Sequence, residues 1–248
     1  MTLRVVVWDA TDVGRFRAGH DGPCHDGPCH DGNGGTADVH FGLSPAWWAG
    51  AKLHALARRV APRWRAAGVA PRWRAEVEGV EYQSRGVRSW GEAARFAVSC
   101  ARAAQAPLAE LQVWGHGGWG FMDLGETRLD RGALARSSEL AGDLDALRDV
   151  LADGAQVWLR CCSAFGGRAG RAFAPALSAR LSTRVVGHTY VIHALQSGTH
   201  SLSPGDRTDW PLEEGVVMKD GEPARAKTSG PLQPRTIGCL RLDLPRGW

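Results

Sequence analysis

One histidine stands in a glycine-rich segment directly after an apolar run. Residues 111–120 read Leu-Gln-Val-Trp-Gly-His-Gly-Gly-Trp-Gly, a pattern that predicts a strand running into a tight turn at His116. Glycines permit such a turn and leave backbone N–H groups free to approach a ligand. A histidine at the end of a strand can act as a general base near neutral pH. A histidine that merely caps a backbone carbonyl explains the same residues equally well.

Two adjacent cysteines end a second segment of the same kind. Residues 156–167 read Gln-Val-Trp-Leu-Arg-Cys-Cys-Ser-Ala-Phe-Gly-Gly, which predicts a strand followed by a glycine-led helix. A thiol near a helix N-terminus has a lowered pKa and more thiolate. Alternation along a strand directs Cys161 and Cys162 to opposite sides, so at most one faces His116, and a buried structural cysteine is the ordinary alternative. A thiol and an imidazole on adjacent strand ends suffice for nucleophilic acyl transfer.

The elements that must position these residues alternate between strand and helix. Apolar strands between amphipathic helices predict an α/β fold with a mainly parallel sheet covered by helices on both faces. Ser89 and Glu92 form a capping box at the start of one helix, and an Asp-Gly pair at 220–221 indicates a hairpin. We expect strands at 3–8, 111–114, 155–159 and 184–186, and helices over 44–60, 89–104, 140–151 and 169–177.

The carboxyl ends of these strands define the expected site. In open α/β sheets the ligand binds beyond the carboxyl ends of the strands. The residues at the four predicted ends are Asp9, His116, Cys161 with Cys162, and His188. Each predicted strand therefore ends in a chemically useful side chain.

A strand ending in His-Gly, followed by a strand ending in Cys, resembles the caspase-like (clan CD) cysteine peptidases. His116 and Cys162 are 46 positions apart, close to the spacing of about 50 residues between the caspase histidine and cysteine. The segment from Gly115 to Gly125, together with Gly166, Gly170 and Phe173, is similar above all to uncharacterised bacterial caspase-like and CHAT-type domains. The resemblance covers roughly 110–190 and a first strand at 3–9.

This resemblance implies a single three-layer sandwich domain over 1–248 and a cytoplasmic cysteine peptidase. Cys162 would be the nucleophile, His116 the base, and the backbone N–H groups of Gly117 and Cys162 the oxyanion hole. The substrate would be a protein or peptide, cleaved through a thioester without a cofactor. The caspase signature Gln-Ala-Cys-x-Gly is absent, because the cysteine stands in Arg-Cys-Cys-Ser. Candidates for the substrate pocket are Asp9, Trp119, Asp123, Cys161, His188 and Gln196.

Two functions of other classes stay open. The same crevice could belong to a non-catalytic caspase-like module that binds a protein or a small ligand. The chain could also bind zinc, through His116, Cys162 and His188 or through a repeat in which His-Asp-Gly-Pro-Cys occurs at 20–24 and again at 25–29. The weak metal candidates in that repeat are His20, Cys24, His25 and Cys29; their five-residue spacing differs from that of ordinary zinc sites.

The repeats also predict where loops are inserted into the domain. The His-Asp-Gly-Pro-Cys repeat, and an Ala-Pro-Arg-Trp-Arg-Ala repeat at 61–66 and 70–75, are too short for a solenoid. We interpret them as low-complexity loop insertions at about 10–43 and 61–85. They leave one compact domain around the expected site.

Composition limits the remaining classes. The chain has 248 residues, 44% hydrophobic and 23% charged, which is the balance of a globular protein. No apolar run approaches the roughly 20 residues of a membrane span, and the first residues do not form a signal peptide, so we expect reduced thiols inside the cell.

Residues 58–74 contain six arginines and no acid; without them the net charge of +4 becomes −2. The basic character is therefore local and argues against a nucleic-acid partner. The oligomeric state is left open.

Overall fold

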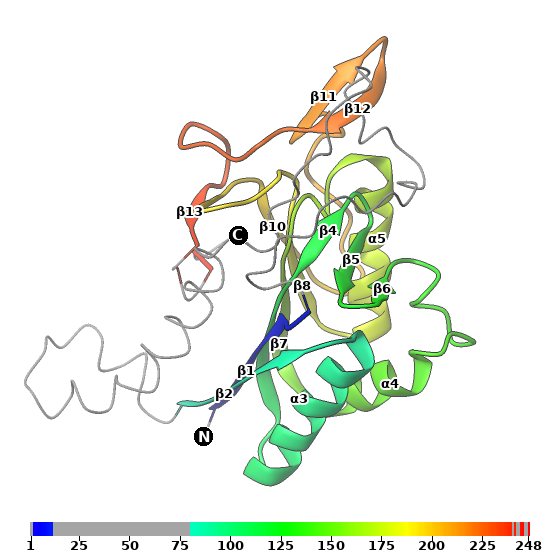
Figure 1. Ribbon diagram of the computed structural model, residues 1–248, viewed down its shortest axis with the longest axis vertical. Helices are drawn as coiled ribbons and strands as arrows, with labels where there is room; N and C mark the ends of the chain where they lie inside the picture. The colour runs from blue at the N-terminus through cyan, green and yellow to red at the C-terminus, as the bar shows by residue number, and fades with distance from the viewer. Residues whose placement is uncertain (1, 12–79, 240, 242–243, 246–247) are drawn as a thin grey trace, which may run out of the picture.

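A six-stranded sheet forms the centre of the protein (Figure 1). The computed structural model describes residues 2–11, 80–239, 241, 244–245 and 248. From one edge to the other, the strands are β2 (Val80–Val87), β1 (Thr2–Asp9), β3 (Leu108–Trp114), β7 (Leu151–Arg160), β8 (Arg184–His188) and β10 (Thr199–Leu202). Neighbouring strands are parallel except for β10, which runs antiparallel to β8. The predicted α/β class and mainly parallel sheet are confirmed.

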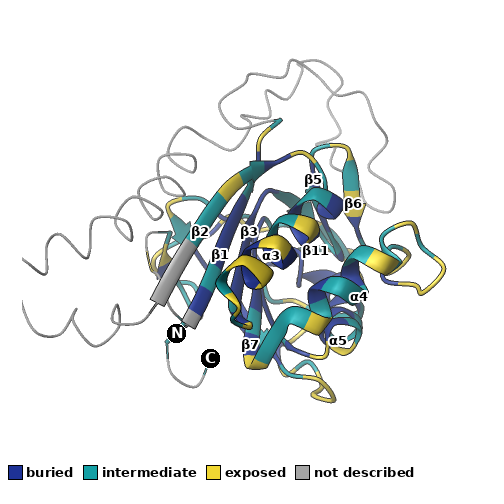
Figure 2. Ribbon diagram, turned by 90° about the horizontal axis from the view of Figure 1, so that it is seen from below, coloured by how far each residue is buried: buried dark blue, intermediate teal, exposed yellow. Residues whose placement is uncertain are grey.

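Three described helices cover one face of this sheet. They are α3 (Trp90–Ala104), α4 (Ala141–Val150) and α5 (Gly167–Leu181), and they lie on the same side in Figure 1. Exposed residues mark their outer surfaces, whereas the strands behind them are mostly buried (Figure 2). The predicted helix at 44–60 lies outside the described residues. Within the described part of the chain, helices are thus seen on one face.

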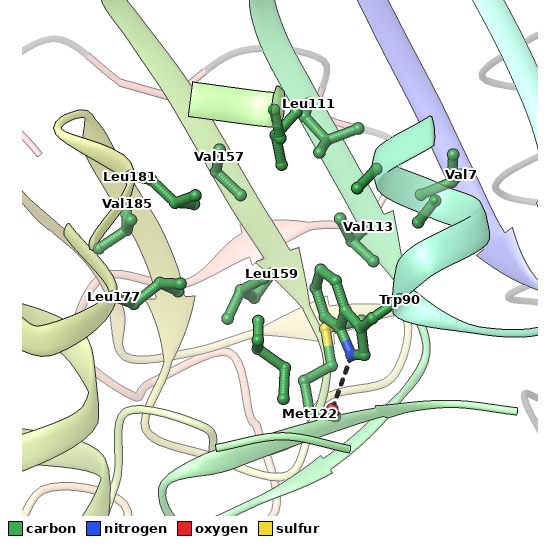
Figure 3. Close-up of a cluster of buried hydrophobic side chains, with 14 of the residues drawn as sticks. Val7, Trp90, Leu111, Val113, Met122, Val157, Leu159, Leu177, Leu181 and Val185 are labelled. Carbon is green, nitrogen blue, oxygen red and sulfur yellow. Dashed lines mark hydrogen bonds between the residues drawn. The ribbon is translucent and has the colours of Figure 1, made fainter. Parts of the chain in front are cut away.

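Alternation along the strands builds the core between sheet and helices. Alternate side chains of the central strands point toward the helices and are buried: Leu3, Val5 and Val7 of β1, Leu111 and Val113 of β3, and Val157 and Leu159 of β7. Trp90, the first residue of α3, seals one end of this core, and its indole N–H donates to the Met122 carbonyl over 2.9 Å (Figure 3). The side chains labelled in Figure 3 are Val7, Trp90, Leu111, Val113, Met122, Val157, Leu159, Leu177, Leu181 and Val185.

The opposite face is covered in part by the C-terminal segment. Trp158 and Val186 of the sheet pack there with Ile237, and Leu244 and Trp248 lie against them. This face also holds a fully buried arginine, Arg160. The chain therefore returns across the sheet after its last central strand.

Smaller sheets complete the fold. β4 (His116–Gly118), β5 (Phe121–Leu124) and β6 (Thr127–Leu129) form a meander directly after β3; β9 (Leu195–Gln196) pairs with β13 (Ile237–Gly238); β11 (Val216–Lys219) pairs with β12 (Glu222–Ala226). Asp220 and Gly221 join the last pair with φ values of 52° and 82°, the left-handed conformation of a type I′ turn. The predicted hairpin is confirmed.

One boundary prediction is wrong. β2 begins at Val80, so the last part of the loop insertion expected at 61–85 is a strand. Its apolar and polar residues alternate poorly, and an edge strand needs one buried face only. The remainder of that insertion, and the one expected at about 10–43 beyond Thr11, lie outside the described residues. None of the described helices has the length and apolar character that a membrane crossing requires.

Candidate active site

The register of two central strands sets His116 and Cys162 at matching positions. β3 and β7 are parallel neighbours, and their ladder ends with Trp114 opposite Arg160. His116 follows Trp114 by two residues, and Cys162 follows Arg160 by two. Adjacent strands lie about 4.8 Å apart, so both residues follow neighbouring strand ends at the carboxyl edge of the sheet.

Close backbone contacts keep the two segments together beyond the ladder. The Gly115 N–H donates to the Arg160 carbonyl over 3.4 Å, and the Gly120 N–H donates to the Ala164 carbonyl over 3.1 Å. Between them, a Cβ on Gly117 would lie 2.7 Å from Cys161 Sγ and 2.9 Å from the Cys162 carbonyl oxygen. A side chain larger than hydrogen does not fit there. Glycine at this position is what lets β4 run against the cysteine pair.

The two cysteines point to opposite sides, as alternation predicts. Cys161 is fully buried in the core beneath the helices, where burial raises the pKa of its thiol well above the usual range. Cys162 packs on the other face, against Trp114 and Ile192. Cys161 therefore belongs to the core and not to the predicted substrate pocket.

His116 shares the face of Cys162. A Cβ on Gly115 would meet Met122 and Leu124, and a Cβ on Gly117 would meet Cys161, all of them members of the core under the helices. The residue between two such positions points the other way. The half-buried His116 side chain is thus directed to the side of the sheet on which Cys162 lies.

Cys162 holds a neutral thiol, contrary to the lowered pKa expected from a helix N-terminus. Burial raises the pKa of this thiol above its usual value, and the hydrogen bond to the Ile192 carbonyl, 3.9 Å from Sγ, only partly offsets the effect. The helix α5 begins at Gly167, five residues further along the chain. The helix dipole acts within the first turn, so it does not reach this thiol strongly enough to outweigh burial.

A strained residue follows the cysteine. Ser163 has φ of 43°, a left-handed conformation that is uncommon for residues other than glycine. Its backbone N–H donates to the Tyr190 carbonyl over 2.8 Å, and its carbonyl accepts from the Gly166 N–H over 2.8 Å. The chain thereby turns sharply from β7 toward α5. Such strain is often found at functional sites.

The segment after β8 forms one wall of the site. Its carbonyls at Tyr190 and Ile192 accept from Ser163 and Cys162. From this region the sequence predicted His188 and Gln196 as pocket residues and did not single out Ile192. Nothing in a lone apolar residue marks a backbone carbonyl as the partner of a thiol.

A buried polar network fixes the start of this wall. Glu214 accepts from Thr189 Oγ1 over 2.9 Å and lies 2.5 Å from Nε2 of His200, a residue that is 2% exposed. Burial alone would raise the pKa of Glu214, but the hydrogen bonds from His200 and Thr189 lower it. The His200 ring also stacks on Trp210, with centroids 4.4 Å apart. Sequence reasoning missed this network because its members are distant along the chain.

Asp9 links β1 to the β4–β6 meander through hydrogen bonds. One carboxylate oxygen accepts from the backbone and the hydroxyl of Thr11, at 2.8 and 2.7 Å, and the other accepts from the Gly125 N–H over 2.8 Å. The side chain is 2% exposed. Both oxygens are therefore occupied, and the prediction that Asp9 lines the substrate pocket is not supported.

Asp123 lies beside His116. The two are cross-strand partners in β4 and β5, and side chains of such a pair are about 5 Å apart at Cβ on the same face. Asp123 also forms a two-pronged ion pair with Arg128, at 2.8 and 3.0 Å. Its position favours a role toward His116 over the predicted contact with substrate.

Trp119 packs on the start of α5. A Cβ on Gly166 would lie 3.0 Å from the indole Nε1, and one on Gly167 would lie 3.2 Å from the ring. The indole nitrogen is buried and has no hydrogen-bond partner among the described residues. Trp119 therefore packs on the segment that leads from Cys162 into α5, and its place in a substrate pocket stays a prediction.

His188 and Gln196 are interior residues. Nε2 of His188 accepts from the Trp158 indole over 3.3 Å, and Nδ1 lies 3.2 Å from Thr199 Oγ1. Burial and the nearby Arg160 guanidinium lower the pKa of His188 to about 3. Gln196 accepts from Arg160 over 3.0 Å, and both His188 and Gln196 are 0% exposed. The prediction that these two line an accessible pocket is wrong, because the C-terminal segment covers this face.

The described residues test the predicted metal sites only in part. No three His, Cys, Asp or Glu side chains within 2–11 and 80–239 come together as a metal site. Both ring nitrogens of His188 have protein partners, which removes it from the proposed set with His116 and Cys162. The weak candidates His20, Cys24, His25 and Cys29 lie outside the described residues.

Comparison with known proteins adds no family to this geometry. No protein-family model matches the chain, and no curated protein matches it significantly. A proposal of function therefore rests on the arrangement of residues and on the resemblance found in the sequence.

Proposed function

We propose that the protein is a cysteine peptidase in which Cys162 is the nucleophile and His116 the general base. The observation that carries the proposal is the register of β3 and β7, whose paired carboxyl ends lead within two residues to His116 and Cys162 at the same edge of a mainly parallel sheet. The resemblance to caspase-like peptidases supports it, because that resemblance pairs a histidine and a cysteine after successive strands. The site is made by backbone geometry, with Gly117 as the contact point.

The chemistry would proceed by acyl transfer. Cys162 Sγ attacks the carbonyl carbon of a peptide bond while His116 takes the thiol proton. The carbon–nitrogen bond then breaks, and the imidazolium returns the proton to the leaving amine. Water, deprotonated by His116, hydrolyses the thioester and releases the acid with the thiol restored. Backbone N–H groups of Gly117 and Cys162 would stabilise the oxyanion.

The raised pKa of Cys162 determines how the first step must occur. In the free protein the thiol is neutral and donates to the Ile192 carbonyl. The thiol must leave this carbonyl and transfer its proton as the substrate binds, so proton transfer is part of the attack. Asp123 is the cross-strand partner of His116, and both of its carboxylate oxygens accept from Arg128, so it brings an ion-paired carboxylate next to the imidazole.

A peptide-library cleavage assay with purified variants tests the proposal. We expect Cys162→Ala to abolish cleavage and His116→Ala to lower kcat/KM by about 10²–10⁴-fold, the usual contribution of a general base. Cys239→Ala is the matched control, because Cys239 is also a half-buried free thiol but lies outside the site. Robust cleavage by Cys162→Ala would contradict the assignment of the nucleophile.

A non-catalytic binding module is the second candidate, and the neutral thiol held by Ile192 favours it. In this case wild type would cleave no peptide of the library, and binding of a library peptide would be the same for Cys162→Ala as for wild type. If the protein is an enzyme, wild type cleaves peptides of the library and Cys162→Ala does not. The two readouts, cleavage and binding, therefore separate the two functions.

A further inference from the structure

A cavity of about 430 Å³ opens at the other end of α5, away from the cysteine pair. The helix begins at Gly167 near Cys162 and ends at Leu181, and the cavity lies between its last turns, α4 and the loop that precedes α4. α4 and α5 lie next to each other in Figure 2. The lining residues are Arg131, Leu134, Ala135, Arg136, Arg148, Ala176, Ala179, Arg180 and Ser182.

Two of the four lining arginines are held in place by carboxylates. Asp145 Oδ1 accepts from Arg148 over 2.6 Å and from Arg180 over 2.7 Å. Arg148 also contacts Asp149 at 2.9 Å, and Arg180 donates to the Ala141 carbonyl over 2.8 Å. The Arg180 side chain is only 8% exposed. These bonds fix two guanidinium groups before any ligand arrives, which lowers the ordering cost of binding.

The other two arginines have no such partner. Arg131 and Arg136 are exposed, and neither forms an ion pair within the described part of the chain. The Nε atom of Arg180 is buried and also has no hydrogen-bond partner among the described residues. Among the ion pairs of the described residues, Asp145 and Asp149 are the carboxylates that contact these four guanidinium groups, so the lining arginines outnumber their paired carboxylates.

The arginines around the cavity affect the pKa of one carboxylate, Asp145. The hydrogen bond from Arg180 lowers the pKa of Asp145, and the charges of Arg180, Arg148 and Arg136 act in the same direction. The charge of Arg136 therefore acts on the same carboxylate as those of the two anchored arginines. An anion entering the cavity would meet charges from three different elements of the fold.

We propose that this cavity binds a small phosphorylated molecule, with its phosphoryl group on the arginines. Guanidinium groups match phosphate oxygens in geometry and charge, and paired N–H donors make these contacts stronger than neutral hydrogen bonds. Leu134, Ala176 and Ala179 supply an apolar wall for the body of the ligand. The volume falls in the range of small-ligand pockets, about 300–1,000 Å³, and well above that of a bare phosphate ion.

Isothermal titration calorimetry on the full chain at low ionic strength tests this inference. The probes are inorganic pyrophosphate and glucose 6-phosphate, and we expect both to bind with one-to-one stoichiometry. Arg136→Gln and Arg131→Gln should each weaken binding about tenfold, the usual worth of a charge-assisted hydrogen bond. Both residues are exposed in a loop, so a melting temperature equal to that of wild type will show that the fold is kept.

Arg207→Gln is the matched control, because it removes an exposed arginine outside the cavity. Equal weakening by Arg207→Gln and Arg136→Gln would overturn the inference, as would the absence of binding by both probes. A phosphoserine peptide that binds at least tenfold more tightly than both probes would also overturn it, because the ligand would then be a protein segment. Peptidase activity enters none of these readouts, so the outcome is independent of the function proposed for Cys162.

Discussion

Gly117 holds the backbone of β4 against the cysteine pair, and its substitution should damage the site directly. A Cβ there would lie 2.7 Å from Cys161 Sγ and 2.9 Å from the Cys162 carbonyl. Because a backbone atom is among the neighbours, the clash is relieved only by separating the two segments. We expect Gly117→Ala to lower the free energy of unfolding by about 1–3 kcal/mol, measured by urea denaturation.

The control for Gly117 is another glycine changed in the same way. Gly142 lies in α4 with open space around its Cβ position, so Gly142→Ala should raise stability by about 0.5–1 kcal/mol through the better helix propensity of alanine. Opposite signs for the two variants confirm that packing against the cysteines requires Gly117. Equal effects would contradict the close contact.

His188 makes the stability of the protein depend on pH. Its pKa is about 3 in the folded protein, below the value of about 6.5 in an unfolded chain. Between these values the unfolded chain binds a proton that the folded protein does not, so stability falls as the pH drops from 6.5 toward 3. The slope from this residue is about 1.4 kcal/mol per pH unit.

The variant His188→Gln isolates this contribution. Glutamine can replace the hydrogen bonds to Trp158 and Thr199 but does not titrate. Between pH 7 and pH 4.5 we expect wild type to lose about 2–3 kcal/mol more of its unfolding free energy than the variant. Carboxylates titrate in both proteins and cancel in the difference. Parallel pH profiles would show that His188 keeps an ordinary pKa.

At the scale of elements, the apolar runs and the capping signals were sufficient for the central architecture. The strands predicted at 3–8, 111–114, 155–159 and 184–186 all exist, as do the helices at 89–104, 140–151 and 169–177. The meander after β3 was missed because its strands are three or four residues long. Periodicity needs a longer window than that to be recognised.

The start of α3 provides a test of one of those signals. Ser89 Oγ accepts from the Glu92 N–H over 3.1 Å, and Glu92 in turn accepts from the Arg88 N–H over 2.8 Å. Removing the cap by Ser89→Ala should cost about 1 kcal/mol. Ser99→Ala, at an exposed position inside the same helix, should be neutral or slightly stabilising. Urea denaturation of both variants measures the difference, and equal stabilities would mean that the cap contributes nothing.

At the scale of the whole molecule, the sequence predicted that His116 and Cys162 follow two successive strands. It could not show the register in which these strands pair. The separation of 46 residues between His116 and Cys162 is also the offset between Trp114 and Arg160 in the ladder, a fact that only the three-dimensional pairing reveals. The burial of His188 and Gln196 could not be predicted for the same reason. The residues that cover them are Ile237, Cys239, Leu244 and Trp248, which are remote in sequence and follow no periodic pattern.

Arg160 joins this covering segment to the central strand, and the last prediction concerns its removal. The side chain is 0% exposed, and it donates to Gln196 Oε1 and the Cys239 carbonyl at 3.0 Å each, and to the Arg241 carbonyl. Its guanidinium lies 3.7 Å from the Trp158 ring centroid. Arg160→Met keeps much of the volume but leaves buried acceptors unpaired, each worth about 1–3 kcal/mol.

We therefore expect Arg160→Met to lower the free energy of unfolding by about 3–5 kcal/mol, because three acceptors lose their donor. Arg102→Met, on the exposed surface of α3, is the matched control and should change stability by less than about 0.5 kcal/mol. Urea denaturation measures both. Limited proteolysis should also cut the C-terminal segment faster in Arg160→Met, because the hydrogen bonds that fasten it to β7 are lost. A variant as stable and as resistant as Arg102→Met would show that the segment is held by its apolar contacts alone.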